Sequence, residues 1–213
     1  MLTFVTGCYA REMVLEDPVI SLQQQGIKNV LFLGFNIKPN LKFPSKVRER
    51  LEAVLFKEFE HFEAINLVKA DKKDLELYSS YKPEELGILA KKYKSELMIT
   101  GNISDYKEIK YLDQPVPGFY RGNEPVPGDS VNLKSLVRFQ IGIDGNFSLI
   151  KPDGKILWTQ RIDEVESVEF EGLPGESSDN KEEMSAYVNT REKLVSDVTS
   201  KVIRNLLPYY TYK

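Results

Sequence analysis

Residues 30–35, VLFLGF, decide the fold of this chain, because they form an apolar run with no charged or strongly polar position. A short run of this kind is typical of a strand that is buried on both faces. Downstream, Pro39 and Pro44 mark a connector, and Ser45 is suited to cap a following helix. That helix is predicted because apolar residues then recur at spacings of three and four: Val47, Leu51, Val54, Leu55, Phe59 and Phe62.

The pattern then continues to alternate between strand and helix. Residues 64–68 predict a second strand, and Pro83 suits the first position of a second helix. Residues 96–103 predict a third strand that continues outward through Ile109. Residues 71–81 are polar and are expected to be irregular. Because strands that alternate with helices pair in parallel, this half of the chain predicts a partly parallel sheet.

The second half predicts antiparallel strands. Residues 136–143 alternate between apolar and polar, residues 144–145 are expected to bend or bulge this strand, and residues 151–154 (KPDG) signal a turn into the next strand. A closing helix is expected over residues 185–207, followed by tyrosines that we expect to dock on the sheet: Tyr209, Tyr210 and Tyr212. The predicted fold class is α/β, with a mixed sheet (β-α-β-α-β followed by antiparallel strands and a C-terminal helix) and helices packed against it.

Two long loops are predicted, over residues 113–130 and 171–184. The first contains two Pro-Val-Pro-Gly copies, and proline excludes it from a central strand because proline has no N–H. A proline-ordered loop that carries aromatic and arginine side chains is typical of a recognition surface, although it could instead pack on its own domain. The candidate partner-binding residues are Pro115, Pro117, Phe119, Tyr120, Arg121, Pro125 and Pro127.

Cys8 is the only cysteine, and it follows Val5, Thr6 and Gly7. This order resembles the lipobox of bacterial lipoproteins, which have an aliphatic, a small, and a Gly or Ala residue before the cysteine. The resemblance implies signal cleavage between Gly7 and Cys8 and attachment of a diacylglycerol to the Cys8 thiol, with palmitate among the acyl chains. Seven residues precede Cys8 and none is basic, so a complete signal requires a start codon further upstream or implies a trimmed chain.

On this interpretation residues 1–7 are the remnant of a signal peptide, residues 8–26 are a lipidated tether, and residues 27–213 are a single α/β domain. One alternative is a short cytosolic N-terminus in which Cys8 is an inert packing residue. Another is that residues 9–26 are an ordered arm, packed on the domain through Val19, Ile20 and Leu22.

The composition limits the classes of function. Hydrophobic residues make up 41% and charged residues 29%, which is typical of a globular chain, and the net charge of −3 gives no footprint for nucleic acid. No apolar stretch reaches the length of a membrane-spanning helix. A single cysteine excludes an internal disulfide and a cysteine-rich zinc site.

Five stretches are together similar to a family of envelope lipoproteins: residues 30–35, the helix that holds Leu51 and Leu55, and residues 62–65, 89–93 and 97–103. That family includes the curli-secretion channel subunit and the lipoprotein activator of a penicillin-binding protein, and the amino-terminal domain of the Tol translocation protein shares its fold. Where the family often has Gly-Ala-Asp, this chain has Lys94-Ser95-Glu96. The resemblance covers residues 28–170 and implies a periplasmic location.

No catalytic motif occurs, so we expect no enzyme, no metal and no cofactor. His61, the single histidine, lies between a helix and a strand without a nearby nucleophile. The acids Asp163, Glu164 and Glu166 could do acid–base work in principle, but a solvated strand edge is the simpler interpretation.

The sequence therefore predicts a lipid-anchored periplasmic envelope protein, a non-enzymatic adaptor that binds a partner protein of a cell-wall or envelope machine. Tyr9, rather than Asp, follows Cys8, which in such lipoproteins implies the outer membrane. One alternative is a subunit of an oligomeric ring or secretion channel in the outer membrane, with self-association left open. The other, if the lipobox is spurious, is a cytosolic domain that binds a small molecule.

Overall fold

A computed structural model describes residues 13–62, 64–77, 81–112, 135–172 and 181–212. Its main sheet has five strands in the order β3-β2-β4-β5-β6. Strand β2 is parallel to β3 and β4, whereas β4-β5 and β5-β6 are antiparallel. This confirms the predicted mixed α/β sheet, whose strands are β2 Asn29–Ile37, β3 Asn66–Lys69, β4 Leu97–Leu112, β5 Ser135–Ile150 and β6 Ile156–Gly172.

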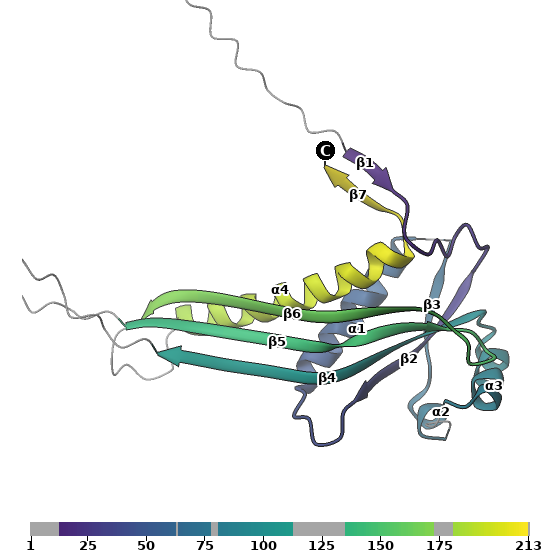
Figure 1. The fold of residues 1–213 in the computed structure, drawn as a ribbon, viewed down its shortest axis with the longest axis horizontal. Coiled ribbons are helices and arrows are strands. Elements are labelled where there is room, and N and C mark those ends of the chain that lie inside the picture. The colour runs from purple at the N-terminus through teal and green to yellow at the C-terminus, as the bar shows by residue number, and fades with distance from the viewer. Residues whose placement is uncertain (1–12, 63, 78–80, 113–134, 173–180, 213) are drawn as a thin grey trace, which may run out of the picture.

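The continuous apolar run in β2 is explained by helices on both faces of the sheet. Val30 and Phe32 face one hydrophobic cluster, with helices α1 (Ser45–Glu60) and α4 (Lys181–Leu206). Leu31 and Leu33 face a second cluster, with helix α3 (Pro83–Tyr93). All four side chains are buried, so β2 is buried on both faces, as its sequence predicts. In Figure 1, α3 lies at one end of the sheet, and β4, β5 and β6 run well beyond it.

Strands β4 and β5 pair along almost their whole length, with one irregularity. The register shifts between Ile103 and Asp105 of β4, opposite Gly145 and Asp144 of β5. A Cβ atom at Gly145 would lie 2.2 Å from the carbonyl oxygen of Asn102, so a larger residue would force the backbones apart there. The bulge predicted at residues 144–145 is therefore in the partner strand, and β5 continues without interruption.

The first described residues form an arm that is part of the folded unit. Strand β1 (Met13–Glu16) pairs antiparallel with β7 (Tyr209–Tyr212), the last strand of the chain. The N–H of Ile20 donates to the carbonyl of Asn205 at 2.8 Å, and Leu22 is fully buried in the cluster under α1 and α4. Residues 13–26 are therefore not a free tether, as one interpretation of residues 8–26 expected. They form the ordered arm of the alternative interpretation, packed on the domain through Ile20 and Leu22. Val19 is exposed.

Three local expectations differ from the structure. Ser45 is the first residue of α1 and makes no capping hydrogen bond, because Pro44 occupies the cap position. Residues 71–81 contain a short helix, α2 (Lys72–Leu77), held by hydrogen bonds from Lys92 and Tyr93 to Asp74. The terminal tyrosines pair with β1 in a separate two-stranded sheet rather than docking on the main sheet.

The loop expected over residues 171–184 is shorter in the structure. Its first two residues belong to β6 and its last four belong to α4. Residues 113–130 lie outside the described part of the chain.

Candidate functional site: an open strand edge beside a groove

The lipid-attachment candidates lie outside the described residues, and so does the candidate partner-binding loop. This applies to Cys8, Gly7, Pro115, Pro117, Phe119, Tyr120, Arg121, Pro125 and Pro127. Their assigned roles remain predictions from the sequence.

The acids considered for acid–base chemistry do not converge. Asp163 lies on the outer face of β6, opposite Asp144 of β5, whereas Glu164 and Glu166 face α4 and bind Lys201 and Lys193. His61 is the exposed residue that ends α1. Within the described ranges, no three His, Cys, Asp or Glu side chains are grouped as metal ligands would be.

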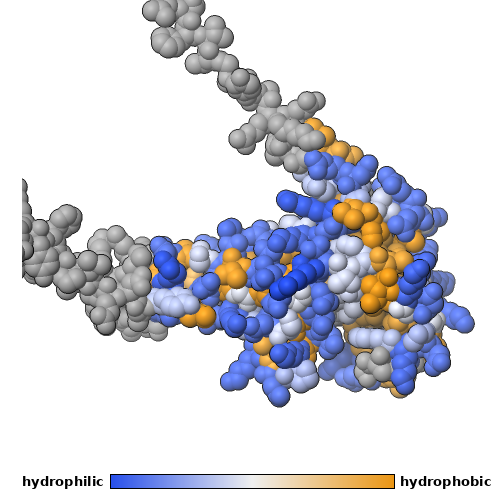
Figure 2. All heavy atoms as spheres, in the orientation of Figure 1, coloured by the Kyte–Doolittle hydropathy of each residue, from blue (hydrophilic) through white to orange (hydrophobic). Residues whose placement is uncertain are grey.

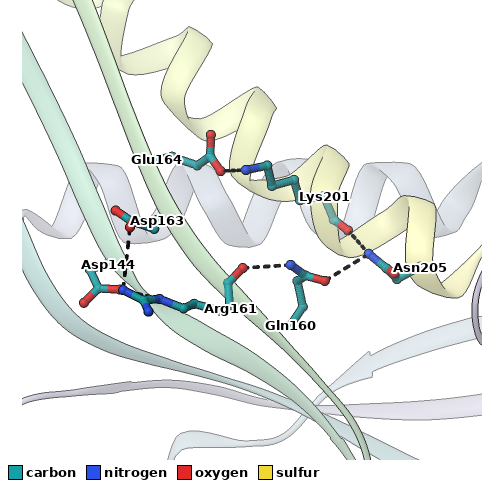
Figure 3. Close-up of polar contacts among 7 residues, drawn as sticks. All are labelled: Asp144, Gln160, Arg161, Asp163, Glu164, Lys201 and Asn205. Carbon is teal, nitrogen blue, oxygen red and sulfur yellow. Dashed lines mark hydrogen bonds and ion pairs between the residues drawn. The ribbon is translucent and has the colours of Figure 1, made fainter.

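The outer face of the long strands carries a row of three aspartates, Asp105, Asp144 and Asp163, on β4, β5 and β6. They surround a small hollow of about 100 Å³ above Gly142. The Arg161 guanidinium lies 3.8 Å from Asp144 and 3.6 Å from Asp163 (Figure 3). Lys107 pairs with Asp105 at 2.7 Å and thereby holds the pKa of that carboxyl below its usual value. Basic neighbours therefore balance much of the charge of this row.

Strand β6 is the last strand of the main sheet, so its outer edge is open in the described part of the chain. One portion of this strand is held to α4 by polar contacts that Figure 3 shows. The Asn205 amide donates to the Gln160 side chain at 3.3 Å, and Lys201 binds Glu164. The portion of β6 around residues 166–168 lies instead beside a groove.

The groove has a volume of about 580 Å³ and lies between β6 and the N-terminal half of α4. Most of its lining side chains are small and uncharged, so they leave space between the strand and the helix. Its only charged lining residues are Glu166 and Lys193, which pair at 2.5 Å. The full lining is Glu166, Ser167, Val168, Ser185, Ala186, Asn189, Thr190 and Lys193. An open strand edge next to a mainly uncharged groove can accommodate an extended polypeptide.

Glu108 of β4 is the centre of a polar cluster that holds this part of α4 to the sheet. Its carboxylate accepts hydrogen bonds from the hydroxyls of Tyr106 and Tyr187 and from the Arg191 guanidinium, whose Nη2 is 2.6 Å away. Burial acts to raise the pKa of Glu108, but these donors outweigh it and hold the pKa below its usual value. Burial and the nearby Glu108 raise the pKa of Tyr187 to about 12. Glu108 is therefore ionised at neutral pH and can accept these hydrogen bonds.

A carboxyl pair lies beside the groove. Burial and the neighbouring Glu166 raise the pKa of Asp197 on α4, although Lys193 acts in the opposite direction. Because the folded pKa lies above that of the unfolded chain, the native state holds the proton more tightly. This contribution to stability is present at low pH and is lost as the pH rises through the raised pKa.

We expect Asp197→Asn to raise the Tm at pH 7, because the amide keeps the hydrogen bond and removes the repulsion from Glu166. The gain should shrink as the pH falls through the raised pKa of Asp197, because Asp197 of the parent is then itself protonated. Thermal melts of both proteins across this pH range measure the difference. Asp17→Asn, which removes one charge from an exposed residue of the arm, is the control. A gain that is the same at every pH would contradict the assignment.

Sequence patterns did not single out the groove residues. The run of acids in β6 and the small residues at the start of α4 are visible in the sequence. Their spacings do not show that Val168 and Ala186 line one groove, because this depends on where α4 crosses the sheet. The fold and the groove together define an α/β domain in which the edge strand β6 lies beside a mainly uncharged groove.

No family model and no curated protein matches this chain. Among solved structures, it is similar to a homologue of a neuraminyllactose-binding hemagglutinin from Helicobacter pylori, at 13% identity over 88% of this chain and 87% of the other, with a TM-score of 0.43. It is also similar to the PelC dodecamer from Paraburkholderia phytofirmans, at 11% identity over 91% and 95%, with a TM-score of 0.38. A lipoprotein from Neisseria meningitidis aligns at 11% identity over 82% and 97%, with a TM-score of 0.37. Scores of this size do not assign the chain to a family.

Across the described residues, no helix is long and apolar enough to span a bilayer.

Proposed function

We propose that this chain is a lipid-anchored, non-enzymatic adaptor of the bacterial envelope. It binds a partner protein by strand addition, in which an extended segment of the partner pairs with the open edge of β6. The groove between β6 and α4 is the observation that carries the docking part of this proposal. The lipobox at Cys8 supports the anchor, and Tyr9 after it supports the outer membrane, with the domain facing the periplasm.

Strand addition suits this edge for a physical reason. An edge strand presents backbone N–H and C=O groups that an extended peptide can pair with, and every second side chain of that peptide then points to one face. Here that face meets the groove, which is lined by Val168, Ala186 and Thr190. Backbone pairing supplies affinity, and the groove has room for apolar side chains of that peptide.

The charge of β6 favours a basic partner over a second copy of this chain. The strand contains five acidic residues and one basic residue, and basic side chains of this chain already pair with four of the acids: Asp163, Glu164, Glu166 and Glu169. Two β6 strands side by side would bring these acids together, and like charges on neighbouring strands destabilise pairing. A partner segment with lysine or arginine beside apolar residues complements the net negative charge of this strand and the groove beside it.

A photo-crosslinking amino acid at Asn189, which lines the groove, tests this docking mode in cells. We expect it to crosslink one partner protein through an extended basic segment, which mass spectrometry of the crosslinked peptide identifies. Ser185→Trp partly fills the groove from an exposed position and should reduce the yield by about tenfold, a loss of about 1.4 kcal/mol in binding. The same crosslinker at Met184, an exposed position of α4 outside the groove lining, is the matched control.

Three results would contradict strand addition at β6. The first is no crosslink from Asn189, or the same products from Asn189 and Met184. The second is a yield that Ser185→Trp does not change. The third is a crosslink to another copy of this chain, which would support ring assembly instead.

A further inference from the structure

The two ends of the described chain form a ribbon that projects from the domain (Figure 1). It consists of β1 and β7, which pair with Leu15 opposite Tyr210 and Glu16 opposite Tyr209. Residues that are directly opposite in an antiparallel pair share a face of the ribbon. Leu15 and Tyr210 therefore lie on one face with Met13, and Glu16 and Tyr209 lie on the other.

The two faces differ in their contacts. On the Glu16 face, the Tyr209 hydroxyl donates to the Glu16 carboxylate at 2.9 Å, and the Arg204 guanidinium lies 5.4 Å from the centre of the Tyr209 ring. On the other face, Met13, Leu15 and Tyr210 are 58%, 54% and 68% exposed. Figure 2 shows hydrophobic atoms on the ribbon. An isolated two-stranded ribbon is only marginally stable in water. An exposed apolar face on it therefore indicates that the ribbon packs against a second surface.

We propose that the face formed by Met13, Leu15 and Tyr210 rests on the lipid surface that holds the anchor, an inference that depends on the proposed lipidation of Cys8. Met13 follows Cys8 by five residues, and a fully extended chain covers at most about 3.6 Å per residue. The ribbon therefore lies within about 18 Å of an acylated Cys8. Tyrosine suits the boundary between water and lipid, where its ring is buried and its hydroxyl is solvated.

The size of this face favours a bilayer over a second copy. A stable interface between proteins buries about 800 Å² on each partner, far more than three side chains supply. A short covalent link to the membrane makes the second contact intramolecular, so a small apolar area is sufficient to hold the ribbon down. The contact would set the orientation of the domain, and hence of the β6 groove, relative to the membrane.

The test couples the full chain chemically to vesicles through Cys8. Phosphatidylcholine vesicles that carry a maleimide headgroup lipid react with this thiol, the only one in the chain. The background variant is Trp158→Phe, which removes the single tryptophan, and Tyr210→Trp then places a probe on the ribbon. Leu77→Trp is the matched control, since Leu77 is 69% exposed and its helix, α2, lies far from the ribbon (Figure 1).

We expect brominated acyl chains to quench Tyr210→Trp several-fold more than Leu77→Trp, with a blue shift of the ribbon probe alone. Adding Leu15→Asn to the Tyr210→Trp protein should lower this quenching, because it removes apolar surface from the face. Equal quenching of the two probes would overturn the proposal. A blue shift that grows with protein concentration without vesicles would also overturn it, in favour of self-association. Because the coupling is chemical, neither result depends on native acylation, which palmitate labelling tests separately.

Discussion

Replacing Cys8 with serine is expected to abolish acylation of this protein and release it from the membrane fraction. In the proposed anchor, the thioether to diacylglycerol forms on the Cys8 sulfur, and this chain has no second cysteine that could substitute for it. Each buried CH₂ group of a lipid anchor contributes about 0.8 kcal/mol to membrane binding. Loss of all the acyl chains therefore removes most of the binding energy and releases the protein. The measurement is palmitate labelling with membrane fractionation, on the gene expressed with its upstream in-frame DNA.

Thr6→Ala is the matched control for this experiment, because alanine keeps a small residue two positions before the cysteine. It should leave labelling and fractionation unchanged. Absence of label in the parent protein would remove the anchor and the compartment from the proposed function. Label that persists in Cys8→Ser would show that the lipid is attached elsewhere.

Leu22→Ala is expected to destabilise the protein by roughly 3 kcal/mol, within the range of about 2–5 kcal/mol for a buried leucine. Leu22 is fully buried and belongs to the cluster that joins α1 and α4 to the sheet. The truncation leaves a cavity where the arm meets the domain. In a chain of this length, a loss of this size lowers the Tm by about 6–12 °C, which calorimetry or thermal circular dichroism measures.

Val19→Ala, three residues earlier in the same arm, is the control because Val19 is 78% exposed. It should change stability by no more than about 0.5 kcal/mol. Equal and small effects of the two substitutions would mean that the arm is a detachable spacer. A large effect at Leu22 alone would place the start of the folded unit well before residue 27.

The elements that could be predicted from the sequence are those whose pattern is local. The apolar run in β2 and the three- and four-residue spacing in α1 and α3 depend only on which face of each element is buried. The turn at residues 151–154 depends on the backbone preferences of proline, aspartate and glycine, and the structure closes it with the N–H of Gly154 donating to Lys151.

The sequence-based predictions were wrong where the conformation of a segment depends on contacts with residues far away in the chain. Residues 13–16 are a strand because residues 209–212 pair with them, at the opposite end of the chain. Leu22 is buried because α4 and the sheet leave room for it, although the glutamines that follow it suggested a tether. Helix α2 is short, and Asp74 within it is held by Lys92 and Tyr93 of α3.

The candidate sites also divide into features that local sequence patterns predict and features that depend on contacts between distant segments. By itself, the sequence determined the fold class and the burial of β2 on both faces, and it predicts the lipobox at Cys8, since each depends on residues that are adjacent or periodic along the chain. Only the tertiary structure decided that β6 is an edge strand, where α4 leaves a groove beside Val168, and which face of the terminal ribbon exposes Leu15 and Tyr210. The physical reason is that an edge, a groove and a paired ribbon are relations between segments, and the register and crossing position that create them come from packing of the whole core.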